Sequence, residues 1–157
     1  MSLKIQSSPR VAGREPHVAE LDLVVPFTTP ELTRIALDAA NRMGAGLNAT
    51  IRLIRVQVVP FPLEPDQSPV NIELLKEQMA DVRSDLPVAA EIRLARSAED
   101  GLLGTLADES VVVLAAPKRF WTTSTERLAA ALRRAGHMVV LVNPAAPAGT
   151  MQESQHA

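Results

Sequence analysis

The chain has 157 residues, of which 46% are hydrophobic and 22% are charged, and its formal net charge is -2. This length suits one globular domain, and the near-neutral charge argues against a protein built to bind nucleic acid. The absence of cysteine excludes disulfides, thiolate nucleophiles and cysteine-ligated metals. We expect a cytoplasmic protein that does not insert into a membrane, because the chain has neither an apolar run of about 20 residues nor an apolar secretory core.

Two terminal segments lack any hydrophobic period. Residues 1–17 include three basic side chains, and residues 145–157 consist mainly of alanine, proline and small polar residues. Segments of this kind cannot bury enough apolar surface to become ordered on their own. We therefore predict flexible tails over 1–17 and 145–157, with one domain spanning residues 18–144.

The first strand and helix of the domain have clear boundary signals. Residues 21–25 are an apolar run of strand length. Thr29 is then suited to cap a helix, and Pro30 is suited to its first turn. Apolar residues recur at helical spacing as far as Met43, and two glycines close to it end the helix.

The same alternation of strand and helix continues along the chain. Runs of branched apolar residues predict further strands at 49–59, 88–94, 111–116 and 138–142. Apolar residues at helical spacing predict helices at 69–82, 97–107 and 124–135. The strand at 88–94 alternates apolar residues with Glu91 and Arg93, which is typical of a sheet edge. The alternation predicts a single-domain α/β fold, an open parallel sheet of five strands with helices on both faces.

Three stretches of the sequence resemble the universal stress protein family, and the resemblance covers residues 21–142. The family's first strand and helix resemble LDLVVPF and the alanine-rich helix after it. Its third helix and fourth strand resemble SAEDGLLGTLADESVVVLAA, and its last helix and strand resemble TSTERLAAALRRAGHMVVLV. The resemblance implies an adenine-nucleotide alpha-hydrolase-like sheet of strand order 3-2-1-4-5. The topological switch point would then lie between the first and fourth strands.

The sequence departs from the family at the nucleotide site. ATP-binding members carry an Asp just after the first strand, where this chain has Pro26, Phe27 and Thr28. They also carry a glycine motif after the fourth strand, where this chain reads AAPKRFWTTSTER without a glycine. Thr123 can stand for the hydroxyl residue that ends the motif. The resemblance therefore implies a degenerate nucleotide site.

A candidate nucleotide or anion site lies at the carboxyl edge of the sheet, because ligands of open α/β sheets bind there at the switch point. Its candidate residues are Phe27, Thr28, Ala115, Lys118, Arg119, Thr123 and Ser124. Two cations and several hydroxyls would meet the positive end of a helix, where an anion is favoured. The alternative is that Thr123 only caps the helix and that the two cations are solvated.

All four aromatic residues of the chain come shortly after predicted strands. They are Phe27, Phe61, Phe120 and Trp121, and we expect them to gather at the carboxyl edge. They could form a base-stacking pocket, fill the place that relatives use for adenine, or present an apolar patch to a partner protein. The sequence leaves these three interpretations open.

No catalytic constellation is visible in the sequence. His17 and His156 lie in the predicted tails, and His137 opens the last strand at the amino edge. There is no P-loop, nucleophile elbow or spacing of metal ligands. We therefore expect that the protein is not an enzyme and holds no metal or cofactor, with ATP or AMP as the doubtful exception.

The preferred hypothesis is a non-catalytic universal-stress-protein-like domain that acts in stress response or regulation. It would bind a protein partner at the aromatic carboxyl edge, or form a homodimer through the last strand, as the resemblance implies. One alternative is an ATP- or AMP-binding stress protein with a modified phosphate loop. Another is a cytoplasmic regulatory domain of a membrane transporter.

Overall fold

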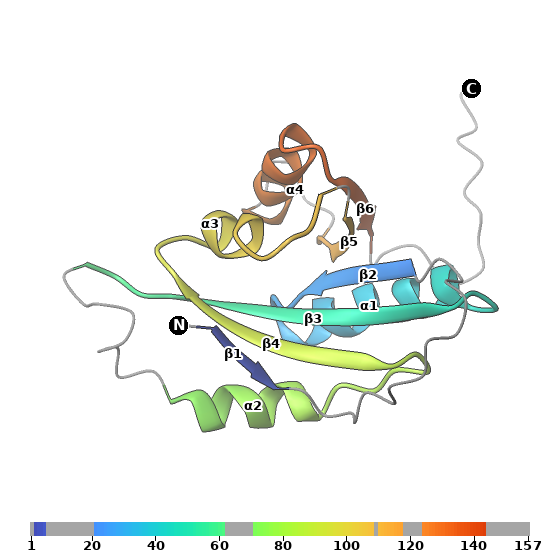
Figure 1. Cartoon of the computed structure of the whole chain (residues 1–157), viewed down its shortest axis with the longest axis horizontal. Coiled ribbons are helices and arrows are strands. Elements are labelled where there is room, and N and C mark those ends of the chain that lie inside the picture. Colours follow the sequence, from blue (N-terminus) through green and yellow to red (C-terminus); the bar gives the residue numbers. More distant parts are fainter. Residues whose placement is uncertain (1, 6–20, 62–70, 109, 118–123, 144–157) are drawn as a thin grey trace.

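The computed structural model describes residues 2–5, 21–61, 71–108, 110–117 and 124–143. Within these residues one sheet has the strand order β1-β4-β3-β2-β5-β6 (Figure 1). The strands are β1 (Ser2–Ile5), β2 (Leu21–Pro26), β3 (Ala49–Val58), β4 (Val88–Ala95), β5 (Val111–Ala115) and β6 (Met138–Val142). Strands β2 to β6 are parallel to one another, which confirms the expected five parallel strands and their order 3-2-1-4-5.

The sixth strand, β1, was not expected. It pairs antiparallel with the outer edge of β4, where Ser2 lies opposite Arg93 and Ile5 lies opposite Ala90. The prediction of a flexible tail over residues 1–17 is therefore wrong for residues 2–5, while 6–17 and the predicted tail at 145–157 lie outside the described residues. The prediction that β4 is an edge strand is wrong too, because β1 satisfies the backbone groups that β4 would otherwise leave free.

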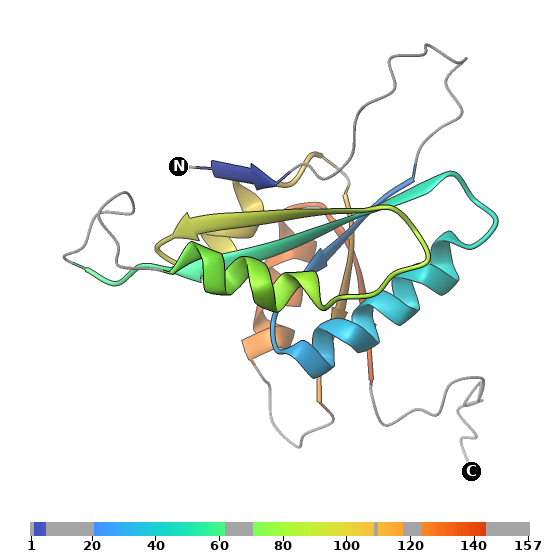
Figure 2. The ribbon, with the colours of Figure 1, turned by 90° about the horizontal axis from the view of Figure 1, so that it is seen from below.

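Helices cover both faces of the sheet, as predicted (Figures 1 and 2). They are α1 (Pro30–Gly44), α2 (Ile72–Ala80), α3 (Ala98–Leu103) and α4 (Ser124–Arg134). Residues of α1 and α2 belong to one hydrophobic cluster, and residues of α3 and α4 belong to another. The central strands contribute side chains to both clusters, because successive side chains of a strand point to opposite faces of the sheet. Leu23 and Val25 thus belong to the first cluster, and Val24 belongs to the second.

Capping side chains set where the helices begin. Thr29 caps α1 as expected, since its Oγ1 accepts a hydrogen bond from the Leu32 N–H at 3.2 Å. The second helix begins later than predicted, at Ile72, where Asn71 Oδ1 accepts from Leu74 N–H at 3.1 Å. The third helix is shorter than the predicted 97–107, because it ends at Leu103 before a glycine cap. These differences change element lengths but not the topology.

Candidate functional site

The switch point lies where the sequence places it. Strand β2 pairs with β3 on one side and with β5 on the other. The chain leaves β2 toward α1 on one face of the sheet and leaves β5 toward α4 on the opposite face (Figure 1). The carboxyl ends of β2 and β5 therefore flank the position where ligands of open α/β sheets bind.

Four of the seven candidate site residues are described. Phe27 is buried, donates its backbone N–H to Ile54 O at 2.7 Å and shares a core cluster with the buried Ala115. Thr28 is half-buried, and its N–H donates to Thr33 Oγ1 at 3.1 Å. Ser124 is exposed at the start of α4.

The other three candidates, Lys118, Arg119 and Thr123, lie outside the described residues. The structure thus brings Phe27 and Ala115 together in the core, and Thr28 follows Phe27 directly. The anion site that the sequence places in the loop after β5 stays a prediction.

A stacked arginine holds the Phe27 ring. The guanidinium carbon of Arg55, on β3, lies 4.8 Å from the centre of the ring, and Arg55 Nη1 donates to Gln78 Oε1 on α2 at 2.7 Å. Desolvation by burial lowers the pKa of Arg55. These contacts connect the residue after β2, the interior of β3 and the last turn of α2. The place just after the first parallel strand is consequently occupied by a buried aromatic ring.

Phe61 has a different environment. Its side chain follows β3 and is 81% exposed, while Arg96 stacks on its ring at 4.0 Å and donates through Nη1 to Val59 O at 3.1 Å. Phe27 comes directly after β2, and Phe61 comes three residues after the end of β3. The Phe27 ring is buried in the core, whereas the Phe61 ring faces solvent. The remaining aromatic residues, Phe120 and Trp121, lie outside the described residues.

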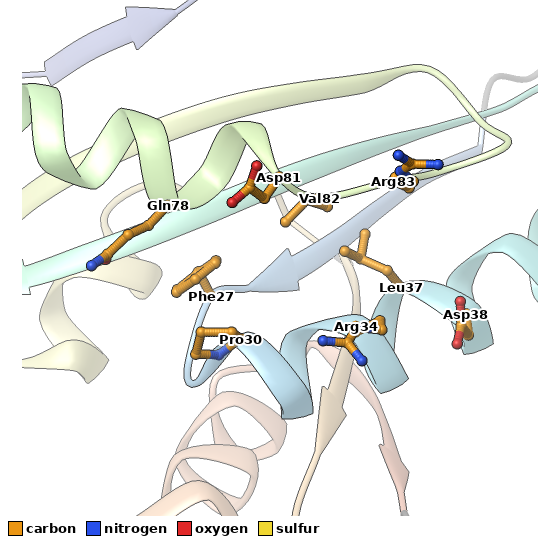
Figure 3. Close-up of a pocket in the computed structure, with 9 residues that line it drawn as sticks. All are labelled: Phe27, Pro30, Arg34, Leu37, Asp38, Gln78, Asp81, Val82 and Arg83. Carbon is orange, nitrogen blue, oxygen red and sulfur yellow. The ribbon is translucent and has the colours of Figure 1, made fainter.

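A cavity of about 350 Å³ opens between α1 and α2 (Figure 3). Its lining residues are Phe27, Pro30, Arg34, Leu37, Asp38, Gln78, Asp81, Val82 and Arg83. Phe27 is the one candidate site residue among them, so this cavity is not the predicted crevice between β2 and β5. Figure 3 shows the residues of α1 along one wall and those of α2 and the following turn along the other.

Sequence reasoning missed Arg55, Gln78 and Arg34. The signal for Arg55 was its position inside the apolar strand β3, because a charged side chain there needs a partner. Arg34 and Gln78 carry no comparable signal, because polar residues on one side of an amphipathic helix are ordinarily solvated.

The described part of the chain contains neither a cluster of metal ligands nor a membrane-spanning helix. No three His, Asp or Glu side chains there are grouped so that they could hold a metal ion. None of the helices described is both long enough and apolar enough to cross a membrane.

No protein-family model matches the chain, and no curated protein matches it. Among solved structures, it is similar to one described as the crystal structure of a universal stress protein in complex with cAMP. The fold resembles that of a universal stress protein. The two chains share 17% sequence identity with a TM-score of 0.48, over 78% of this chain and 96% of the other. At these values the comparison identifies no ligand, and the fold assignment depends on the strand order and crossovers described above.

Proposed function

We propose that the protein is a non-catalytic universal-stress-protein-like domain that acts in stress response or regulation, in the cytoplasm, through a protein partner or a second copy of itself. Its nucleotide site has degenerated. The observation that supports this most directly is Phe27, which is 8% exposed and stacked against Arg55. The resemblance puts the carboxylate of ATP-binding members within the stretch Pro26 to Thr28, and the buried ring in that stretch cannot take over the polar contacts of a carboxylate.

Two surfaces support a binding role. The Phe61 ring is 81% exposed at the carboxyl edge, where a protein partner can cover it together with Arg96. The second surface is the lateral edge of the sheet formed by β6, which pairs only with β5 within the described residues. Met138 and Leu141 of this strand are exposed, and a second copy would bury them by pairing along β6.

Calorimetric titration with ATP and AMP, with and without magnesium, tests the degenerate site. We expect no saturable heat and no thermal stabilisation at millimolar nucleotide, because the described end of β2 offers a buried ring and no carboxylate. Cyclic AMP, the ligand in the solved universal stress protein, is titrated in the same way. Micromolar binding of any of the three nucleotides would contradict the proposal.

If a nucleotide does bind, two variants test whether the loop after β5 is responsible. Lys118→Ala and Arg119→Ala remove the cations that a modified phosphate loop would use. Loss of nucleotide binding in both would establish the alternative function, an ATP- or AMP-binding stress protein. Arg34→Ala is the matched control, because it removes an exposed cation that lines the cavity between α1 and α2 instead.

A further inference from the structure

The cavity between α1 and α2 has an apolar floor. Phe27 lies at one end, and Leu37 and Val82 face each other across the middle (Figure 3). Leu37 is 1% exposed and Val82 is half-buried, so the floor is continuous with the core beneath it. A volume of about 350 Å³ falls within the range of small-molecule sites. The cavity therefore suits the apolar body of a small ligand.

Charges of both signs surround this floor. Wall α1 carries Arg34 and Asp38, which share one helix face because they are four residues apart. The opposite wall carries Asp81 and Arg83. All four residues are exposed, and none forms an ion pair or a side-chain hydrogen bond with another residue in the described ranges. They are thus available to a ligand that carries both an anionic and a cationic group.

One end of the cavity is held in place before any ligand arrives. Arg55 stacks on Phe27 and donates a hydrogen bond to Gln78, and both of these residues line the cavity. A ring and an amide that are already ordered lose little conformational freedom when a ligand binds. This favours recognition of a flat or branched apolar group at the Phe27 end.

We propose that this cavity binds a small zwitterion with an apolar body, of which a free apolar amino acid is the simplest example. The ligand's carboxylate pairs with Arg34 or Arg83, and its ammonium group pairs with Asp38 or Asp81. Its side chain packs on Phe27, Leu37 and Val82. This activity goes beyond the proposed function, since it needs neither a nucleotide nor the loop after β5.

Calorimetry and heteronuclear NMR with L-phenylalanine test the proposal. We expect saturable binding at millimolar or lower concentration, with shifts at residues that line the cavity. The controls are 3-phenylpropionate, which lacks the ammonium group, and 2-phenylethylamine, which lacks the carboxylate. Each should bind at least about tenfold more weakly, because one charge-assisted contact is lost. Equal affinity for all three compounds, or no saturable binding of phenylalanine, would overturn the proposal.

Variants locate the site. Val82→Trp fills the cavity and should abolish binding, whereas Leu74→Trp, on an exposed position of α2 outside the cavity, should leave it unchanged. Asp38→Asn combined with Asp81→Asn removes both carboxylates that can pair with the ammonium group, so this double variant should weaken phenylalanine binding at least about tenfold. Glu77→Gln, on α2 outside the cavity, should not weaken it. The double variant decides the question if Val82→Trp fails to fold. Unchanged binding in a folded Val82→Trp variant, or in the double variant, contradicts the assignment even if the nucleotide titration behaves as proposed.

Discussion

Glu91 of β4 is a buried carboxylate that lies between two arginines. Its Oε2 accepts from Arg52 Nη2 at 2.6 Å, and its Oε1 lies 3.6 Å from Arg93 Nη2. Arg52 Nη1 also lies 3.7 Å from Asp22 Oδ2. Charged side chains of alternating sign thus form a continuous row over the neighbouring strands β2, β3 and β4. These ion pairs explain how β4 carries polar residues without being the edge of the sheet.

Replacing Glu91 with glutamine should destabilise the protein, because two arginines lose their carboxylate while the side-chain shape is kept. We expect the free energy of unfolding to fall by about 2–3 kcal/mol, somewhat less than for a fully buried pair. The arginine side chains are 23% and 21% exposed, so water replaces part of the lost interaction. Urea unfolding followed by circular dichroism measures the change.

The matched control is Glu73→Gln, on α2. Glu73 is exposed and pairs with Lys76 at 2.9 Å. Such surface pairs contribute little, so the change should stay within about 0.5 kcal/mol. Similar losses for the two substitutions would show that the Glu91 cluster contributes no more than a solvated ion pair.

At the scale of elements, the short helix α3 lies close against β3 through Gly101. A Cβ at this position would overlap Val56 Cγ1 and come within 2.8 Å of Val56 Cγ2. Ala95 Cβ would lie 3.1 Å away. The glycine therefore lets the helix backbone approach the sheet, and this short helix is buried at Gly101.

Gly101→Ala should consequently destabilise the protein, although alanine favours a helix over glycine by about 1 kcal/mol. The overlap with Val56 should outweigh that preference and lower the free energy of unfolding by about 1–3 kcal/mol. In a Val56→Ala background the same substitution should be neutral or stabilising. A double-mutant cycle measures this coupling, and equal effects in both backgrounds would exclude the packing explanation.

At the scale of the whole molecule, the two ends of the sheet differ. The β4 end is covered by β1, whereas β6 has no second neighbour within the described residues. Met138 is 63% exposed and Leu141 is 37% exposed on that strand. An uncovered strand with exposed apolar residues favours pairing with another chain, and a twofold dimer would pair the two β6 strands antiparallel.

We therefore expect the wild-type protein to sediment as a dimer and Leu141→Glu to sediment as a monomer, because like charges would meet across the twofold axis. Leu74→Glu is the control, since it places the same charge on an exposed position of α2 and should leave the dimer intact. Sedimentation velocity over a range of concentrations measures the result. A wild-type protein that stays monomeric at high concentration would argue against association through β6.

Much of the fold could be predicted because its signals are local. The apolar runs of β2 and β5 and the helical spacing in α1 follow from the burial of each element. The Thr29 cap and the positive-φ Gly136 after α4 each depend on neighbouring residues alone. The strand β1 could not be predicted in this way, because four residues become a strand only when the edge of β4 is there to pair with them.

The position of the switch point could be predicted, but the surroundings of the side chains near it could not. The switch point puts Phe27 and Ala115 near each other, since the carboxyl ends of parallel strands meet at one edge. The burial of Phe27 and the exposure of Phe61 could not be foreseen, although both rings follow strands. Phe27 is covered by partners from β3 and α2, whereas Phe61 is held by Arg96 and left open to solvent.

Local sequence patterns were enough to predict the α/β class and the parallel strands in their order along the chain. They also show that no carboxylate stands directly after β2 and no glycine directly after β5, because each of these features lies in consecutive residues. Only the tertiary structure decided that β1 closes the β4 edge, that Arg55 stacks on Phe27 and that a cavity opens between α1 and α2. These features are contacts between segments far apart in the chain, and the spacing of apolar residues within one segment does not indicate which distant segment it contacts.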